Sequence, residues 1–450
     1  MLVANRGEIA VRVIRSCREL GIETVLATST VDRDGMAARM ADRAVRVGPA
    51  PASDSYLSIP ALLSAALGTG CDAVHPGYGF LAENPEFAAA CVDKGLVFVG
   101  PRPEAVAQAG DKARARELAR SAGIPVLAGS AVLGSVDAAA KAAVDLGYPV
   151  LVKAAAGGGG RGMRVMADET ELRDGWAAAV AEATSAFGDG RLYVERFVRH
   201  ARHVEVQVLG DRHGSVVHLG ERDCTLQRRH QKVIEESPAP NLPDDVRTRI
   251  RAAGVAFARA LGLDNAGTVE FIHDTDTGEF AFLEFNARIQ VEHPVTEMVT
   301  GVDLVAEQLR AAAGERLTFG QDEIALAGHA IEVRVTAEDA ARGFAPTPGT
   351  VTDWVPPAGE GIRVDSHCEP GYVVTPYYDS LLAKVVAHGP DRDTAADRML
   401  AALGALRVSG IPTTVDFARF VLRHPDFRAG RVSTDWIAAR GLLDYRKRRP

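Results

Sequence analysis

The chain has 450 residues, of which 47% are hydrophobic, and its formal net charge is −8. A chain of this length is too long for one compact core and predicts roughly three globular domains. The acidic balance argues against a nucleic-acid surface, and the sequence has neither an export signal nor the run of about eighteen apolar residues that predicts a membrane span. The five cysteines are scattered and never spaced as a metal pair, so we expect reduced thiols in a cytoplasmic protein.

Short apolar runs alternate with helical patterns in the first hundred residues. The runs are "LVAN", "TVLATS", "DAVH" and "LVFVG", and the helical patterns between them cover Glu8–Leu20, Ile59–Leu67 and Pro85–Lys94. This alternation is typical of a parallel sheet with crossover helices. We therefore expect an N-terminal α/β domain over residues 1–100.

One glycine motif of this domain, "GYGFLA" at Gly77–Ala82, follows a predicted strand and fits a loose dinucleotide-binding fingerprint. It belongs to a late strand, and no strand that ends in Asp or Glu follows after about 20 residues. A nicotinamide dinucleotide site is therefore the weaker interpretation of these glycines.

The rest of the chain divides into a helical linker and two further domains. The linker covers residues 101–125. A smaller domain at 126–197 has a predicted helix near Val136–Leu146 and the strand "YPVLVKA", and it closes near Arg191–Val198. Residues 198–450 read as a large domain with a mixed sheet, a hairpin at "HDTDTGE", and terminal helices from about Asp393.

A run of four glycines stands out in the smaller domain, in "KAAAGGGGRGM" at Lys153–Met163. It lacks the Lys-Ser/Thr of a Walker loop and joins two predicted strands. Consecutive glycines expose backbone N–H groups and reach positive φ, as a flap over phosphate oxygens requires. With Lys153 before the glycines and Arg161 after them, phosphate binding is favoured over a plain hairpin tip.

A basic cluster follows in the large domain. Five of six consecutive positions carry Gln227, Arg228, Arg229, His230 and Lys232. A solvated turn would explain these residues, but in an acidic chain such a focus of positive charge also attracts anionic substrates.

Polar and apolar residues alternate in "FLEFNARIQVEHP", from Phe282 to Pro294. In an extended strand this pattern places one row of polar side chains on a single face: Glu284, Asn286, Arg288, Gln290 and Glu292. A half-buried strand that faces water also alternates, yet carboxylates, amides and a guanidinium are unusual for a solvated strand. We expect this row to face a functional site.

A second carboxylate lies opposite this row. Glu270 in "GTVEFIH" and Glu284 lie on two strands joined by a turn-rich segment, so they are predicted cross-strand neighbours. Two such carboxylates repel each other unless a cation or a proton lies between them, and Asn286 adds a neutral oxygen. The three residues suit Mg²⁺ or Mn²⁺, although a pair of solvated glutamates would share the pattern.

Together these motifs resemble biotin carboxylase, the ATP-grasp component of biotin-dependent carboxylases, over essentially the whole chain. The matching segments are "ANRGEIA" at Ala4, "HPGYGFLAEN" at His75, "GDK" at Gly110, "GGGGRGM" at Gly157, "RHVEVQV" at Arg202, "RDCTLQRRHQKV" at Arg222 and "RIQVEHPVTE" at Arg288. The resemblance implies a three-part ATP-grasp fold of the α/β and α+β classes, in which the small central domain is a lid over ATP.

The resemblance also implies roles for single residues. Groups that bind ATP would be Lys112, Lys153, His203, Gln227 and His230, the loop glycines Gly158 and Gly159, and, at the adenine, Glu195 and the backbone near Val198. Two Mg²⁺ or Mn²⁺ ions would be bound by Glu270, Glu284 and Asn286.

The implied reaction has two steps in one site. Bicarbonate, held by Arg288 and by the backbone near Gln290 and Val291, is deprotonated by Glu292 and attacks the γ-phosphate of ATP to give carboxyphosphate. This intermediate then delivers CO₂ to biotin, whose enolate is stabilised by Arg334. Lys232 completes the catalytic groups of this chain.

The resemblance finally suggests partners. No Met-Lys-Met biotinylation signal occurs, so we expect a separate biotin carboxyl carrier protein and a carboxyltransferase, unless the chain is one domain of a longer polypeptide. Acetyl-CoA carboxylase is the favoured parent system, and propionyl-CoA and pyruvate carboxylases share the half-reaction. We also expect a homodimer near Arg15, Glu19 and Arg363. Another ATP-grasp carboxylate–amine ligase and a silent ATP-binding module are the alternatives.

Overall fold

The N-terminal part of the chain forms a five-stranded parallel sheet in the order β3-β2-β1-β4-β5. The computed structural model of the chain describes residues 1–156 and 162–447. The strands of this sheet are β1 (Leu2–Val3), β2 (Val25–Ser29), β3 (Arg43–Gly48), β4 (Ala73–His75) and β5 (Val97–Phe98), and the helices are α1 (Gly7–Glu19), α2 (Met36–Met40), α3 (Ile59–Gly68) and α4 (Pro85–Asp93).

The sequence predicted four of these strands and the three longer helices to within about two residues at either end. The remaining strand, β3, escaped prediction because it lies at the edge of the sheet, with half of its six residues exposed, and so shows no continuous apolar run. The short helix α2 was not predicted either.

The linker consists of the helices α5 (Pro103–Gly110) and α6 (Lys112–Ser121). Asp111 begins α6 as its N-cap, where the side chain accepts hydrogen bonds from the backbone N–H groups of Ala113 and Arg114. This cap places Lys112 in the first turn of α6, which packs against β13 of the large sheet.

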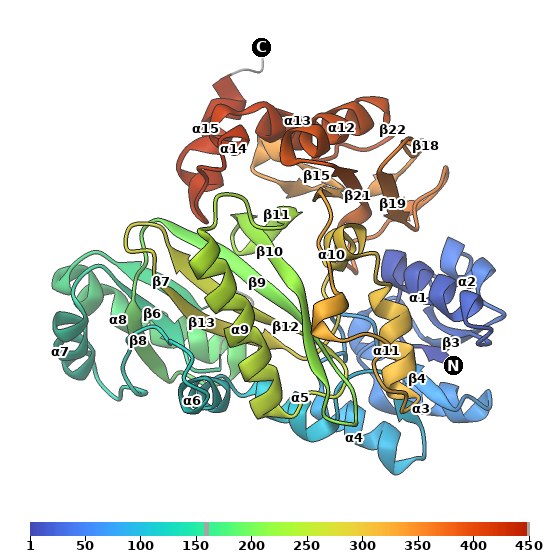
Figure 1. The fold of residues 1–450 in the computed structure, drawn as a ribbon, viewed down its shortest axis with the longest axis horizontal. Coiled ribbons are helices and arrows are strands. Elements are labelled where there is room, and N and C mark those ends of the chain that lie inside the picture. Colours follow the sequence, from blue (N-terminus) through green and yellow to red (C-terminus); the bar gives the residue numbers. More distant parts are fainter. Residues whose placement is uncertain (157–161, 448–450) are drawn as a thin grey trace.

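The central unit is a small three-stranded antiparallel sheet covered by two helices (Figure 1). Its elements are α7 (Val136–Leu146), β6 (Val150–Ala154), β7 (Met163–Met166), α8 (Glu169–Phe187) and β8 (Leu192–Arg196). Its apolar side chains, among them Leu172, Trp176 and Val194, form a core of their own. The unit therefore has a core separate from that of the N-terminal sheet. The two units lie on opposite sides of the molecule (Figure 1).

The large unit is built on an eight-stranded sheet in the order β13-β12-β9-β10-β11-β14-β21-β19. Its strands are β9 (Ala201–Gly210), β10 (Val216–Arg228), β11 (Gln231–Ser237), β12 (Ala266–Asp274), β13 (Phe280–Asn286), β14 (His329–Thr336), β19 (Ile362–Ser366) and β21 (Leu381–Gly389). The sequence predicted a mixed sheet, whereas all neighbouring strands in this order run antiparallel. The reason is that hairpins connect β9 to β10, β10 to β11 and β12 to β13.

Helices cover this sheet and complete the C-terminal part. They are α9 (Asp244–Leu261), α10 (His293–Thr300), α11 (Leu304–Ala312), α12 (Arg392–Ala405), α13 (Val415–Arg423), α14 (Pro425–Arg428) and α15 (Leu442–Lys447). Short strands lie at β15 (Glu338–Asp339), β16 (Ala345–Pro346), β17 (Gly349–Thr350), β18 (Asp353–Val355), β20 (Val373–Val374) and β22 (Arg407–Ser409). Helix α9 packs across β9, β10 and β12, and α12 begins within one residue of the predicted position. Within residues 1–156 and 162–447, no helix combines the length and the apolar character needed to cross a membrane.

Candidate active site

The polar row predicted over residues 282–294 is only partly a strand. Strand β13 ends at Asn286, the chain then bends away from the sheet, and α10 begins at His293 with Pro294 in its first turn. Proline suits the first turn of a helix because its missing N–H has no partner there, so the "HP" pair marked this boundary. The prediction of one continuous strand was therefore wrong beyond Asn286.

The five polar residues of this row nevertheless line one cavity of about 540 Å³ between the units. The bend after β13 returns Arg288, Gln290 and Glu292 to the side of the sheet on which Glu284 and Asn286 lie. Most other candidate residues line the same cavity: Lys112, Lys153, His203, Gln227, His230, Lys232, Glu270, Val291 and Arg334. Glu195 and Val198 lie outside this lining, and Gly158 and Gly159 fall outside the described residues.

Glu270 lies at the centre of the polar contacts. As predicted, it is the cross-strand partner of Glu284. Its carboxylate accepts hydrogen bonds from Asn286 Nδ2 and Gln290 Nε2, each at 2.9 Å, and lies 3.0 Å from His203 Nε2. Burial alone would raise the pKa of Glu270, but Lys232 and His203 lower it to about 2. The buried carboxylate is thus negatively charged at neutral pH.

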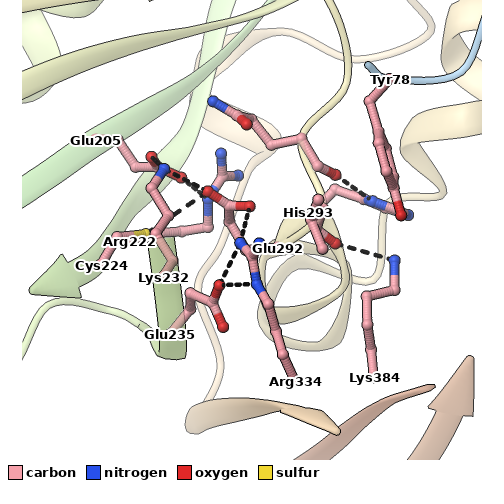
Figure 2. Close-up of polar contacts among 12 residues, drawn as sticks. Tyr78, Glu205, Arg222, Cys224, Lys232, Glu235, Glu292, His293, Arg334 and Lys384 are labelled. Atoms are coloured by element: carbon pink, nitrogen blue, oxygen red, sulfur yellow. Dashed lines mark hydrogen bonds and ion pairs between the residues drawn. The ribbon is translucent and has the colours of Figure 1, made fainter. Parts of the chain in front are cut away.

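Lys232 and Arg334 enclose Glu292 (Figure 2). Lys232 Nζ lies 2.5 Å from Glu292 Oε1, and Arg334 Nη2 donates to Glu292 Oε2 at 2.9 Å. Lys232 also contacts Glu205 and Glu270, and Arg334 donates to Glu235. Burial by itself lowers the pKa of Lys232, but the surrounding acidic groups raise it well above its usual value, so the ammonium remains charged.

A buried layer beneath these residues was missed by the sequence reasoning. Arg222 is fully buried on β10 and donates to Glu205, Gln207 and Thr268. Its partner Glu205 accepts from both Arg222 and Lys232. The alternation in "RHVEVQV", where His203, Glu205 and Gln207 share one strand face, would have predicted this layer.

Arg288 points its guanidinium into the cavity from the bend after β13. Its Nη1 donates to Gln290 Oε1 at 2.9 Å and its Nη2 to Asn286 Oδ1 at 3.1 Å, while Nε lies 2.9 Å from Glu83 Oε2. Glu83 belongs to the N-terminal unit. The fork is therefore held by partners on two units and offers a planar cation to a small anion.

The predicted phosphate-binding lysines lie at the linker and at the central unit. Lys112 Nζ is 3.3 Å from Glu284 Oε2, and Lys153 Nζ is 2.9 Å from Glu195 Oε2. Burial lowers the pKa of Lys153 to about 7, and the charges of Lys112 and Arg116 act in the same direction. Glu195 is also paired with Arg116.

The basic cluster forms the tight hairpin between β10 and β11. Arg229 and His230 have φ of 48° and 65°, and Arg228 pairs with Gln231 across the hairpin. Positive φ at two consecutive central residues is the geometry of a type I′ turn, which glycine or asparagine usually occupies. Bulkier residues in this geometry suggest a functional constraint, because the conformation costs energy that glycine would avoid.

The oxygen donors of this site fit a hard divalent cation. Glu270 and Glu284 supply carboxylates from adjacent strands, and Asn286 supplies an amide. Among the described residues, the potential ligand atoms of His203, Glu205 and Glu270 all lie within 4.8 Å of one another, and those of Glu205, Cys224 and Glu292 do so as well. Glu284 belongs to neither group and lies against Lys112. The predicted ligand set of Glu270, Glu284 and Asn286 therefore shares only Glu270 with the first group.

Known families match nearly the whole chain. The biotin carboxylase N-terminal domain matches residues 1–106, the ATP-binding domain of the carbamoyl-phosphate synthase L chain matches 111–319, and the biotin carboxylase C-terminal domain matches 332–439. Biotin carboxylase of Nostoc sp. is 48% identical over 97% of this chain and 98% of its own length. A pyruvate carboxylase subunit of Methanothermobacter thermautotrophicus is 45% identical over 97% of this chain and 89% of its own length.

Solved structures agree with these matches. Biotin carboxylase of Campylobacter jejuni has a TM-score of 0.94 at 45% identity and covers 97% of this chain and 98% of its own. The biotin carboxylase domain dimer of Hydrogenobacter thermophilus 2-oxoglutarate carboxylase, in complex with MgADP, ADP and bicarbonate, has a TM-score of 0.93 at 46% identity and covers 97% of this chain and 96% of its own. The fold is the predicted three-part ATP-grasp architecture, and the chain belongs to the biotin carboxylase family.

Proposed function

We propose that this chain carboxylates biotin, attached to a carrier protein, at the expense of ATP and with bicarbonate as the carbon source. The observation that carries the proposal is Glu292, a fully buried carboxylate between Lys232 and Arg334 at the wall of a cavity that also contains the Arg288 fork. A positioned general base beside an anion-binding fork suits bicarbonate, which is a poor nucleophile until it is deprotonated.

ATP would lie between the central unit and the large sheet. Lys112, Lys153 and His203 are suited to its phosphates, Gln227 and His230 line the same cavity, and Glu195 with Val198 would receive the adenine. Two Mg²⁺ or Mn²⁺ ions on Glu270, Glu284 and Asn286 would neutralise charge on the transferred phosphoryl group. Cationic groups contribute most of the catalysis in phosphoryl transfer, because the protein has little covalent chemistry to perform.

Bicarbonate would be bound by Arg288 and by the backbone of Gln290 and Val291, within reach of Glu292. After attack on the γ-phosphate, carboxyphosphate and ADP form. Carboxyphosphate would then break down to CO₂ and phosphate, and the phosphate would take the N1′ proton of biotin. The deprotonated biotin would attack the CO₂, and the guanidinium of Arg334 is the cation suited to its enolate. Lys232 keeps Glu292 oriented throughout, since it contacts Glu205, Glu270 and Glu292 at once.

We infer that the partners are a biotin carboxyl carrier protein and a carboxyltransferase, with acetyl-CoA or a related acyl-CoA as the favoured acceptor. The pyruvate and 2-oxoglutarate carboxylase relatives share the half-reaction with other acceptors. We propose a homodimer through α1 and β19, where Arg15 and Arg363 both lie near Asp365 and Glu19 is exposed. The cytoplasm is the proposed location, supported by five unpaired, buried cysteines.

We also propose the predicted units as domains: residues 1–100, a linker at 101–125, a lid at 126–197 and a C-terminal domain at 198–450. The separate core of the central unit supports the lid boundaries.

The proposal is tested by ADP release with MgATP and free biotin, with and without bicarbonate, and then with biotinylated carrier protein. We expect turnover to require both bicarbonate and biotin. A carboxylate–amine ligase would instead need an amine and ignore bicarbonate, and a silent module would bind ATP without turnover under every condition.

A further inference from the structure

Two carbonyl oxygens of the turn that precedes α10 accept hydrogen bonds from the buried side chains of His293 and Lys384 (Figure 2). The carbonyl of Gln290 accepts from His293 Nδ1 at 2.7 Å and from the His293 backbone N–H at 3.3 Å. The carbonyl of Val291 accepts from Lys384 Nζ at 2.9 Å. Because a carbonyl only accepts, the His293 proton must be on Nδ1.

These bonds determine where two backbone N–H groups point. In a planar trans peptide the C=O and the N–H point in opposite directions, so the N–H groups of Val291 and Glu292 point away from His293 and Lys384. Gln290, Val291 and Glu292 line the cavity, whereas His293 and Lys384 are fully buried and do not. Within residues 1–156 and 162–447 neither N–H has an acceptor. Both are therefore available to an anion.

Lys384 is an unusual choice for this support. It is a fully buried lysine on β21, and burying an ammonium is costly unless it is paired. Its partner is Glu8 Oε2 at 3.1 Å, in the first turn of α1, and Asp365 Oδ2 lies 4.0 Å away. The other oxygen of Glu8 accepts from the hydroxyl of Tyr78, whose side chain lines the cavity.

This arrangement joins three parts of the fold at one peptide. Glu8 and Tyr78 come from the N-terminal unit, Lys384 comes from the far half of the large sheet, and Val291 belongs to the turn after β13. A methionine or leucine at position 384 would fill the same space without any desolvation cost. The charge is therefore explained by the orientation of the turn and not by packing alone.

We propose that Lys384, together with His293 and supported by Glu8, is a positioning residue that orients the peptides of Gln290–Val291 and Val291–Glu292 so that their N–H groups bind bicarbonate. The inference rests on the proposed function. Lys384 does not touch the anion. It acts through the backbone, and it holds Glu292 and the two N–H groups in one fixed relation to each other.

The test compares the double variant Glu8→Gln/Lys384→Met with the wild type and with Lys141→Met. Removing both charges avoids a single unpaired buried ion, which would strongly destabilise the fold. Lys141 is exposed on α7, so the control repeats the substitution away from the site. KM for bicarbonate and KM for MgATP are measured separately by ADP release.

We expect KM for bicarbonate to rise about 10- to 100-fold in the double variant, because a charge-assisted hydrogen bond that orients the turn is lost. KM for MgATP and the control should remain within about twofold of the wild type. Equal losses in both KM values, or an unchanged KM for bicarbonate, would refute the positioning role. If ADP release by the wild type does not depend on bicarbonate, the proposed function is refuted, and the inference that rests on it is refuted as well.

A second variant protects the test against poor folding of the first. His293→Phe keeps a buried ring of similar size, introduces no unpaired charge and removes the Nδ1 donor; it also removes Nε2, which lies 3.9 Å from Glu297, but Glu297 keeps Arg12 and Arg363. Bicarbonate should raise the melting temperature of the wild type bound to MgADP and should have little effect on His293→Phe, while MgADP alone stabilises both. A full bicarbonate effect in this variant would contradict the proposal.

Discussion

Replacing Glu292 by glutamine tests the proposed general base most directly. Glutamine has the same size but cannot take a proton at neutral pH. A positioned general base is worth about 10² to 10⁴ in rate, so the variant should lose about 3 to 5 kcal/mol of transition-state stabilisation. Because Glu292 does not contact Lys112 or Lys153, KM for MgATP should change little.

The structure also predicts that this variant folds. Without the Glu292 carboxylate, Lys232 retains Glu205 and Glu270, and Arg334 retains Glu235. The lost hydrogen bonds should lower the free energy of unfolding by about 1 to 3 kcal/mol, which leaves a folded enzyme. Neither cation is left without a carboxylate.

The assay is bicarbonate-dependent ADP release in the presence of biotin, with MgATP binding measured in parallel by calorimetry. Glu315→Gln is the matched control, since Glu315 is exposed and does not line the cavity. A Glu292→Gln variant that keeps more than about a tenth of wild-type kcat would refute the role of Glu292 as the base. So would a variant whose ATP affinity falls as steeply as its rate.

Three further predictions concern ATP, acid stability and assembly. Lys153→Met should raise KM for MgATP about 10- to 100-fold with a smaller effect on KM for bicarbonate, as steady-state kinetics would show; equal effects on both would contradict it. Burial raises the pKa of Glu236, but His329 and Arg392 lower it to about 2. This carboxylate therefore contributes about 3 kcal/mol to the free energy of unfolding above pH 4.5, and the contribution is lost as the pH falls toward 2. Glu236→Gln should lower the free energy of unfolding at pH 7 by that amount and make it depend less steeply on pH in acid, as urea titrations would measure. An unchanged dependence on pH would refute the assignment. Arg15→Glu should shift the proposed dimer toward monomer in sedimentation experiments, and an unchanged mass would place the interface elsewhere.

The sequence predicted the site better than it predicted the local structure that forms the site. The alternation over residues 282–294 correctly grouped five polar residues, although the chain leaves the strand after Asn286. Alternation predicts only which side chains face the same direction. A bend followed by the start of a helix can keep these side chains facing the same cavity although the backbone is no longer a strand. Pro294 indicated the start of helix α10, because proline is common in the first turn of a helix, but the sequence prediction did not use this signal.

Long-range partners could not be predicted in the same way. Glu8 and Lys384 are separated by almost the whole chain, and nothing in either local pattern indicates that they meet. The local pattern likewise gave no prediction for Arg222, yet it is among the most deeply buried side chains. Burial of a charge depends on the charges that fold around it, which a local window of sequence does not contain.

The five cysteines provide a way to follow which parts of the molecule open. Every thiol is buried, and burial raises the pKa of Cys17 to about 11 and of Cys91 and Cys368 to about 12, so that little reactive thiolate exists in the folded state. No cysteine lies between Cys91 and Cys224, the stretch that contains the whole central unit. The rate of cysteine alkylation would therefore measure how fast the N-terminal and C-terminal cores open. It would not report a movement of the central unit, which contains no cysteine.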